Sequence, residues 1–304
     1  MQLLQFPARE GCTAHAALLA RAASFFEPDV AVRHSDYLAP AFLKHAVDWS
    51  PSNWEEAKQV RDYREKCVPG IYYYHLARTR CVDRMVLDQL FQRGDFNAAQ
   101  LVILGAGFDS RAIRFQNQLA GRPVIEVDMP LAQQSKLIAV RQLESFDQSC
   151  LTFVPADLAA KDLEQRLVEF GFNPKARSVF ILEGVSYYLD RTALMRVFDL
   201  VSRSESGSSL VFDFIDEGVL GNKSADYGYG TAEHIDFVEE LGEPFLCGLP
   251  RLPNSMATLL RSHGLRLGSI ADSTTMERTE LVCSDNTLLG RISSHLLLAQ
   301  AFVP

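Results

Sequence analysis

An apolar run over residues 101–104 is followed directly by Gly105, Ala106 and Gly107. Such a run before a glycine turn predicts a buried strand, a tight bend and then a helix. Because glycine has no Cβ, the two glycines let the backbone bend sharply and let a ligand approach it closely. A second apolar run ends at Asp128, 23 positions after Gly105. An acid about 20 residues beyond such a turn is typical of ribose binding, so the pair predicts a nucleoside-containing cofactor across two parallel strands.

The glycine turn lacks the sequence features of dinucleotide-binding and phosphate-binding loops. A dinucleotide fingerprint would need glycine at position 110, where the chain has Ser110, and no Gly-Lys-Ser/Thr phosphate loop occurs. With no pyrophosphate to bind, S-adenosylmethionine fits the pattern better than NAD. The same glycine turn can also serve packing alone, and that alternative stays open at this point.

The composition and net charge of the chain indicate which classes of binding partner to expect. The chain has 304 residues, 47% of them hydrophobic, and a formal net charge of −8. An acidic chain is a poor match for phosphate backbones, so we expect no nucleic-acid partner. The N-terminus lacks the features of a signal peptide and no apolar run has the length of a membrane span, which favours a cytoplasmic protein with no membrane partner. The six cysteines are scattered without zinc-site spacing, so we expect reduced thiols and no metal.

Two regions differ in periodicity. Residues 1–95 are predicted to be a helical cap or substrate region, with helices over 13–26, from about 53, and over 72–91. From residue 96, apolar strands alternate with amphipathic helices, which is typical of an α/β doubly wound, mostly parallel sheet. The predicted elements are strands over 100–104, 123–128, 151–155, 177–183 and 208–215, and helices near 110–120, 130–144, 160–171 and 190–205.

The later part of the chain interrupts this alternation. Residues 216–250 contain glycines and aromatic residues in polar surroundings, among them Gly218, Gly228 and Tyr229, and are predicted to be an inserted lid. A mobile surface connection is the alternative. A helix over 256–263 and closing strands over 265–271, 279–283 and 295–303 are predicted to follow.

Five motifs in sequence order resemble the leucine carboxyl methyltransferase family, and more closely its bacterial branch of small-molecule O-methyltransferases, which includes polyketide-tailoring enzymes. The motifs are RTRCVD at 78–83, VILGAGFDSR at 102–111, EVDMP at 126–130, VPADL at 154–158 and LEGVSYYL at 182–189. The resemblance implies a Rossmann-like class I methyltransferase fold, S-adenosyl-L-methionine as cofactor and a role in secondary metabolism.

The resemblance also implies cofactor contacts. Arg80 would pair with the methionine carboxylate, since a guanidinium matches a carboxylate at two points, and Arg78 is the neighbouring candidate. Gly105 and Gly107 would let the backbone approach the cofactor. Asp128 would accept hydrogen bonds from the ribose hydroxyls. Glu126 lies on the same strand face and is the alternative acid.

Further contacts would come from the next two strand ends. Asp157 would accept from the adenine amino group, with the backbone of Leu158 against the ring. A helix N-cap is the alternative role of Asp157. Glu183 would bind the cofactor's ammonium. The chain departs from the family pattern at Leu182, where tryptophan is common, and at Met129, where a ring residue is common.

The resemblance implies a small-molecule acceptor that would be methylated on a carboxylate or a hydroxyl. A carboxylate needs no base because it is already ionised near neutral pH, whereas a hydroxyl needs one. Tyr187 and Tyr188 are the catalytic candidates, because one ring could face the sulfonium. His75, His234 and His263 are possible bases. Two alternatives remain: cyclisation of the cofactor, as in azetidine-2-carboxylate synthases, and a non-catalytic binding module. A homodimer is the predicted assembly.

Overall fold

The computed structural model describes residues 12–91, 98–141, 148–220 and 228–304. Its contacts divide the chain into two compact units. Unit 1 comprises residues 1–81, 218–245 and 271–296, and unit 2 comprises residues 82–217, 246–270 and 297–304.

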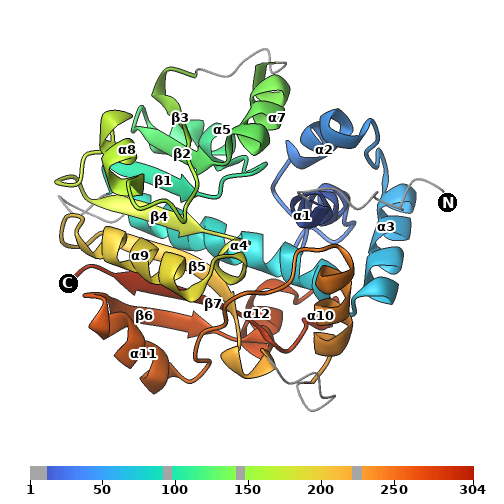
Figure 1. Ribbon diagram of the computed structural model, residues 1–304. Helices are drawn as coiled ribbons and strands as arrows, with labels where there is room; N and C mark the ends of the chain where they lie inside the picture. The colour runs from blue at the N-terminus through green and yellow to red at the C-terminus, as the bar shows by residue number, and fades with distance from the viewer. Residues whose placement is uncertain (1–11, 92–97, 142–147, 221–227) are drawn as a thin grey trace. The chain divides into compact units, whose positions relative to one another are not determined.

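Unit 2 is built on a seven-stranded sheet with the strand order β3-β2-β1-β4-β5-β7-β6 (Figure 1). The strands are β1 (Gln100–Leu104), β2 (Val124–Asp128), β3 (Leu151–Pro155), β4 (Ser178–Leu182), β5 (Ser209–Ile215), β6 (Arg266–Ala271) and β7 (Leu296–Phe302). The pairs β1–β2, β1–β4, β2–β3 and β4–β5 are parallel. The chain therefore winds outward from β1 to β3 and then returns to β4, which confirms the predicted doubly wound α/β fold. The strand order reverses between β1 and β4, the place where such sheets bind ligands.

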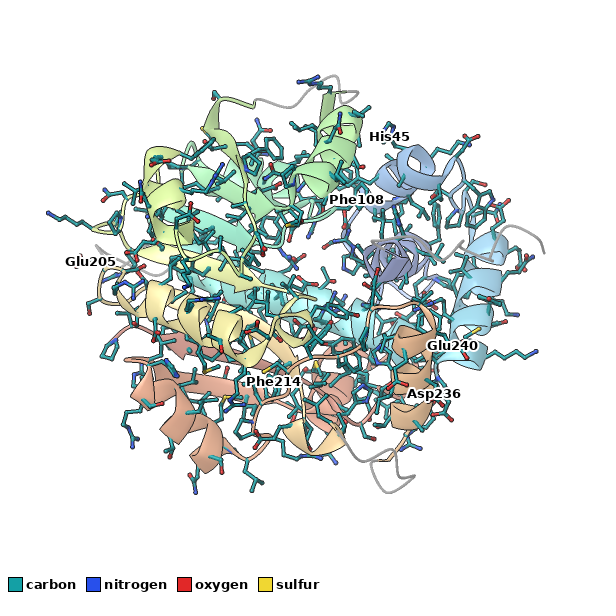
Figure 2. All side chains as sticks on the ribbon, in the orientation of Figure 1. His45, Phe108, Glu205, Phe214, Asp236 and Glu240 are labelled. Carbon is teal, nitrogen blue, oxygen red and sulfur yellow. The ribbon has the colours of Figure 1, made fainter. Side chains whose placement is uncertain are left out.

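The central strands form where apolar residues predominate. Every residue of β1, β4 and β5 is buried, as expected for parallel strands covered on both faces. Phe214 of β5, labelled in Figure 2, belongs to this core together with Phe212 and Phe198. The core therefore holds the carboxyl ends of the central strands in fixed register, and those ends carry the predicted site residues.

Helices connect the strands of unit 2. They are α5 (Arg111–Arg114), α6 (Gln116–Leu119), α7 (Pro130–Arg141), α8 (Leu163–Glu169), α9 (Arg191–Ser202) and α11 (Pro253–Ser262). The single helix predicted near 110–120 is divided at Phe115, whose backbone lies at φ −100° and ψ 15°. The Asp190 side chain accepts a hydrogen bond from the Ala193 amide at 2.8 Å, which starts α9 as an N-cap.

Unit 1 is helical in its first segment, as predicted. Its helices are α1 (Cys12–Ser24), α2 (Ala39–Val47), α3 (Trp54–Cys67), the first part of α4 (Ile71–Leu90), α10 (Thr231–Glu240) and α12 (Ser273–Glu280). Asn53 caps α3 by accepting from the Glu56 amide at 3.0 Å, at the helix start predicted from the sequence. None of the described helices combines the length and the apolar character of a membrane span.

One predicted strand is wrong. Residues 279–283 contain the end of α12, which Asp272 starts by capping the Thr275 amide at 2.8 Å. Only Val282 pairs in a strand-like way, in an isolated bridge with Leu288. The described part of 216–250 contains the short helix η4 (Glu217–Val219) and α10, while residues 221–227 lie outside the described residues. The domain limits at residue 95 and the lid stay predictions.

Candidate functional site

The turn after β1 is tied to the end of β2. The amide nitrogens of Gly105 and Ala106 both donate to the carbonyl of Val127, at 2.8 and 3.0 Å. Gly105 has a φ of 71°, and a Cβ built on it would lie 2.4 Å from Cγ2 of Val185. Both the left-handed backbone and this close approach require glycine here. This glycine therefore serves the packing of the turn.

Gly107 has different surroundings. Its φ is 44°, and a Cβ built on it would meet no atom within 4 Å. Its amide donates to Oδ2 of Asp128 at 2.5 Å, and the Met129 amide donates to Oδ1 at 2.7 Å. Phe108, labelled in Figure 2, continues the turn as a buried side chain. The structure thus places an accessible stretch of backbone directly beside the strand-end acid.

Asp128 can accept more than these two bonds. Burial raises the pKa of its carboxyl group, and the bonds from the Gly107 and Met129 amides counteract that rise. Each carboxylate oxygen offers two lone pairs and receives one amide, so each retains capacity for a hydroxyl donor. Both oxygens are held in fixed directions by the backbone. This geometry fits the predicted pair of ribose hydroxyls.

Glu126, the alternative acid, is fully buried. Its Oε2 lies 2.5 Å from Nζ of Lys136 on α7. Burial raises the pKa of Glu126 to about 7, and the Lys136 ammonium acts in the opposite direction. Because this side chain is occupied inside the protein, Asp128 is the acid of β2 that a ligand could reach.

Asp157 and Leu158 follow β3. The carboxylate of Asp157 accepts from the Ala159 amide at 2.8 Å, and its carbonyl accepts from the Ala160 amide at 3.0 Å. These bonds form a turn, whereas the next helix, α8, starts only after Asp162. The alternative role of Asp157 as a helix N-cap is therefore wrong. Asp157 is exposed and Leu158 is buried; their contacts with adenine stay predictions.

Glu183, which follows β4, belongs to a buried charge cluster that sequence reasoning missed. Arg111 lies at its centre, with nitrogens 2.7 Å from Asp83, 2.5 Å from Asp109 and 2.7 Å from Glu183. Arg114 adds a second guanidinium 2.7 Å from Asp83. The three carboxylates raise the pKa of Arg111 well above its usual value, although burial opposes them. The structure thus places two guanidinium groups among three carboxylates at the β4 end.

Tyr187 and Tyr188 lie on a short helix, η3 (Ser186–Tyr188), and their rings meet edge to face at 4.8 Å. The Tyr187 hydroxyl donates to Oδ2 of Asp213 at 3.4 Å. The other oxygen of Asp213 accepts from the Gly184 amide at 2.7 Å. Asp213 on β5, which the sequence analysis did not identify, therefore positions the segment that carries Glu183 and both tyrosines. Tyr188 is the more exposed of the two rings.

Comparison with known proteins decides the family. A family model described as leucine carboxyl methyltransferase matches residues 14–202, more than half of the chain. The chain belongs to the leucine carboxyl methyltransferase family. The matched range includes the predicted cofactor-binding residues and both candidate tyrosines, from Arg80 to Tyr188.

Curated relatives agree with this membership. The "Putative S-adenosyl-L-methionine-dependent methyltransferase YktD" of Bacillus subtilis (strain 168) is 31% identical over 202 residues, 63% of this chain and 63% of that protein. A protein of the same description, Franean1_4929 of Parafrankia sp. (strain EAN1pec), is 31% identical over 274 residues, 89% of this chain and 81% of its own. The match with YktD thus spans less than two thirds of that relative's length.

Solved structures share the fold at low identity. A DUF574 family protein from Streptomyces avermitilis superposes with a TM-score of 0.60 and 13% identity, covering 87% of this chain and 96% of that one. A "putative methyltransferase" from Thermobifida fusca YX superposes with a TM-score of 0.57 and 18% identity, covering 92% of this chain and 97% of that one. At these identities the likeness shows the fold, and it supports the class I methyltransferase architecture.

The two arginines of the family motif at 78–83 lie on the part of α4 that belongs to unit 1. Arg80 donates to Glu280 at 3.2 Å and to the carbonyls of Arg33 and Ala31 at 2.9 Å each. These bonds use three of the five N–H groups of the guanidinium, so one donor on each terminal nitrogen remains for a carboxylate. The neighbouring candidate, Arg78, is buried with its guanidinium 5.2 Å from the centre of the Tyr74 ring. Both assignments stay predictions.

The candidate bases occupy different surroundings. His263 in unit 2 lies 2.7 Å from Asp199. In unit 1, Nδ1 of His234 lies 3.0 Å from Nε2 of His295, whose Nδ1 lies 3.2 Å from the Thr231 hydroxyl. Burial lowers the pKa values of His75 and His234 well below the usual range. These two histidines are therefore neutral at physiological pH.

Over the described ranges, the metal-ligating side chains form no group of three that could hold a metal ion.

Burial lowers the pKa of His295 to about 3, which gives a testable pH dependence. An unfolded histidine takes up a proton near pH 6.5 and the folded one does not, so stability is lost as the pH falls from 6.5 toward 3. We expect His295→Gln to reduce the stability difference between pH 7.5 and pH 5.5 by about 1.4 kcal/mol. Urea unfolding at both pH values measures this, with His45→Gln on α2 as control. An unchanged pH dependence in His295→Gln would contradict the assignment.

Proposed function

We propose that this protein is an S-adenosyl-L-methionine-dependent methyltransferase that O-methylates a carboxylate or hydroxyl of a small molecule. The observation that carries the proposal is the open backbone at Gly107 beside Asp128, at the carboxyl end of the sheet where the strand order reverses. The relatives' printed names support the cofactor and the reaction class. The family match supports their transfer to this chain.

The residues of unit 2 suit the parts of this cofactor. Asp128 presents two anchored oxygens to ribose hydroxyls, and Asp157 presents an exposed carboxylate to the adenine amino group. Glu183 brings a carboxylate to the end of β4, and a carboxylate there favours an ammonium group beside it. When bound, the cofactor supplies an electrophilic methyl group on a sulfonium. The protein's contribution is to orient the cofactor and the acceptor oxygen, which can supply most of the rate enhancement in a displacement of this kind.

Tyr188 is the better placed of the two tyrosines to meet a ligand. The hydroxyl of Tyr187 is directed at Asp213, whereas Tyr188 is only partly buried and packs its ring against Tyr187. An aromatic face beside a sulfonium stabilises it by about 0.5–2 kcal/mol. We therefore propose that Tyr187 positions the segment and that Tyr188 contacts the cofactor.

The test uses the purified chain with S-adenosylmethionine, first alone and then with a panel of small carboxylic acids and phenols. We expect one-to-one binding by calorimetry, and S-adenosylhomocysteine only when an acceptor is present. Methylthioadenosine with a cyclic amino acid, formed without an acceptor, would instead indicate cofactor cyclisation. Binding without any product across the panel would favour the non-catalytic alternative. No heat of binding and no thermal shift would refute the cofactor assignment.

A further inference from the structure

Arg64 on α3 is a buried cation without a carboxylate partner. Its side chain is 4% exposed, and its Nε has no hydrogen-bond partner in the structure. Within the ranges that the structure describes, no carboxylate forms an ion pair with it. The carboxylate of the adjacent Glu65 accepts from the amides of Gly70 and Tyr72, at 2.8 and 3.0 Å, and attracts Arg64 without forming an ion pair with it. The Arg64 guanidinium lies 5.2 Å from the centre of the Phe237 ring on α10.

Such a guanidinium is costly to bury. Arginine stays protonated in proteins, so burial cannot neutralise it. Moving a charged group out of water without a partner costs several kcal/mol, and one cation–π contact returns only about 0.5–2 kcal/mol. The charge of Glu65 acts on Arg64 only beyond ion-pair distance, so a carboxylate bound directly at the guanidinium would offset part of this cost.

The surroundings of Arg64 add hydrogen-bonding groups and apolar surface. His234 lies one turn before Phe237 on α10 and contacts the Phe245 ring at 5.1 Å. His75 on α4 is 8% exposed, and its Nδ1 has no hydrogen-bond partner. Burial lowers the pKa values of both histidines, and the positive charges of Arg64 and Arg78 lower them further, so both guanidinium groups lie near the two rings. Unit 1 therefore contains a buried basic cluster, defined here as Arg64, His75 and His234.

We propose that this basic cluster binds a carboxylate group of the methyl acceptor, with Arg64 as the ion-pair partner and the two histidines as hydrogen-bonding neighbours. The identity of the ligand as the acceptor rests on the proposed function, whereas the anion site rests on unit 1 alone. A carboxylate is favoured because one guanidinium matches it at two points and balances its single charge. The rings of Phe237 and Phe245 provide apolar contacts for the rest of the molecule. Since a two-point ion pair engages both carboxylate oxygens, this group anchors the acceptor and another oxygen receives the methyl group.

Sodium benzoate and its neutral analogue benzamide test the proposal by calorimetric titration of the full chain, with and without S-adenosylmethionine. We expect saturable benzoate binding and affinity for benzamide at least about tenfold lower, since a hydrogen bond to a charged group is lost. Arg64→Gln should weaken benzoate binding at least about tenfold while leaving S-adenosylmethionine affinity within about threefold. The matched control is Arg291→Gln, which removes an exposed guanidinium lying 4.5 Å over the Tyr229 ring in the same unit. It should leave benzoate affinity unchanged.

A second measurement does not depend on the variant folding or on the shape of benzoate. Crystals of the wild-type protein soaked in sodium iodide should show an anomalous peak at the Arg64 guanidinium. Equal affinities for benzoate and benzamide would overturn the proposal. Unchanged benzoate binding by a folded Arg64→Gln variant would also overturn it. The same conclusion follows if the wild-type protein binds no benzoate and the crystals show no iodide at Arg64. If S-adenosylmethionine fails to bind while benzoate and iodide do, the proposed function fails and the anion site stands. If S-adenosylmethionine binds while benzoate and iodide do not, the anion site fails and the proposed function stands.

Discussion

Replacing Arg111 with methionine is expected to lower the free energy of unfolding by about 3–5 kcal/mol, because it leaves buried carboxylates without their cation. The guanidinium contacts Asp83, Asp109 and Glu183 at 2.5–2.7 Å. Its side chain is 1% exposed, so water cannot replace it. Arg114 contacts Asp83 at 2.7 Å, so it can offset part of the loss at that carboxylate.

Urea denaturation at pH 7.5 measures this loss. The matched control is Arg203→Met, which breaks the ion pair with Glu164 between side chains that are 53% and 37% exposed. A surface pair of this kind contributes about 0–1 kcal/mol, so the control should remain close to wild type. A loss below about 1 kcal/mol in Arg111→Met would show that the cluster does not stabilise the fold in the way its geometry indicates.

Asp128→Ala is expected to weaken S-adenosylmethionine binding by about 1–3 kcal/mol, or about 5- to 150-fold. The substitution removes both proposed bonds to the ribose hydroxyls. It also releases the amides of Gly107 and Met129, which the carboxylate now holds at 2.5 and 2.7 Å. The accessible backbone beside the cofactor would then lose its fixed direction, and this adds to the direct loss.

Calorimetry with S-adenosylmethionine gives the affinity of each variant. Asp272→Ala is the control, since it also removes a carboxylate that accepts two bonds, from the Thr275 amide and hydroxyl, but at the start of α12. We expect it to lower stability and to leave the affinity unchanged. Wild-type affinity in a folded Asp128→Ala variant would reject the ribose assignment.

The sequence predicted the elements that depend on local pattern. The strand limits at 100–104 and 151–155 match β1 and β3, because short, mostly apolar runs rich in β-branched or aromatic residues are typical of strands. The prediction over 279–283 failed, because a short apolar stretch does not by itself distinguish a strand from the end of a helix. The cap at Asp272, which decides this case, was not recognised in the sequence.

The sequence by itself determined the fold class, the family and the glycine turn followed by an acid, since each of these depends on residue types at fixed spacing. Only the tertiary structure decided which charges meet. Asp83, Asp109 and Glu183 are brought to Arg111 by the register of β1 with β4 and by the packing of α4. The tertiary structure also decided that Lys136 forms an ion pair with Glu126, and that Nε of Arg64 has no hydrogen-bond partner among the described residues. Such pairings depend on the distances between side chains remote in sequence, which local patterns do not encode.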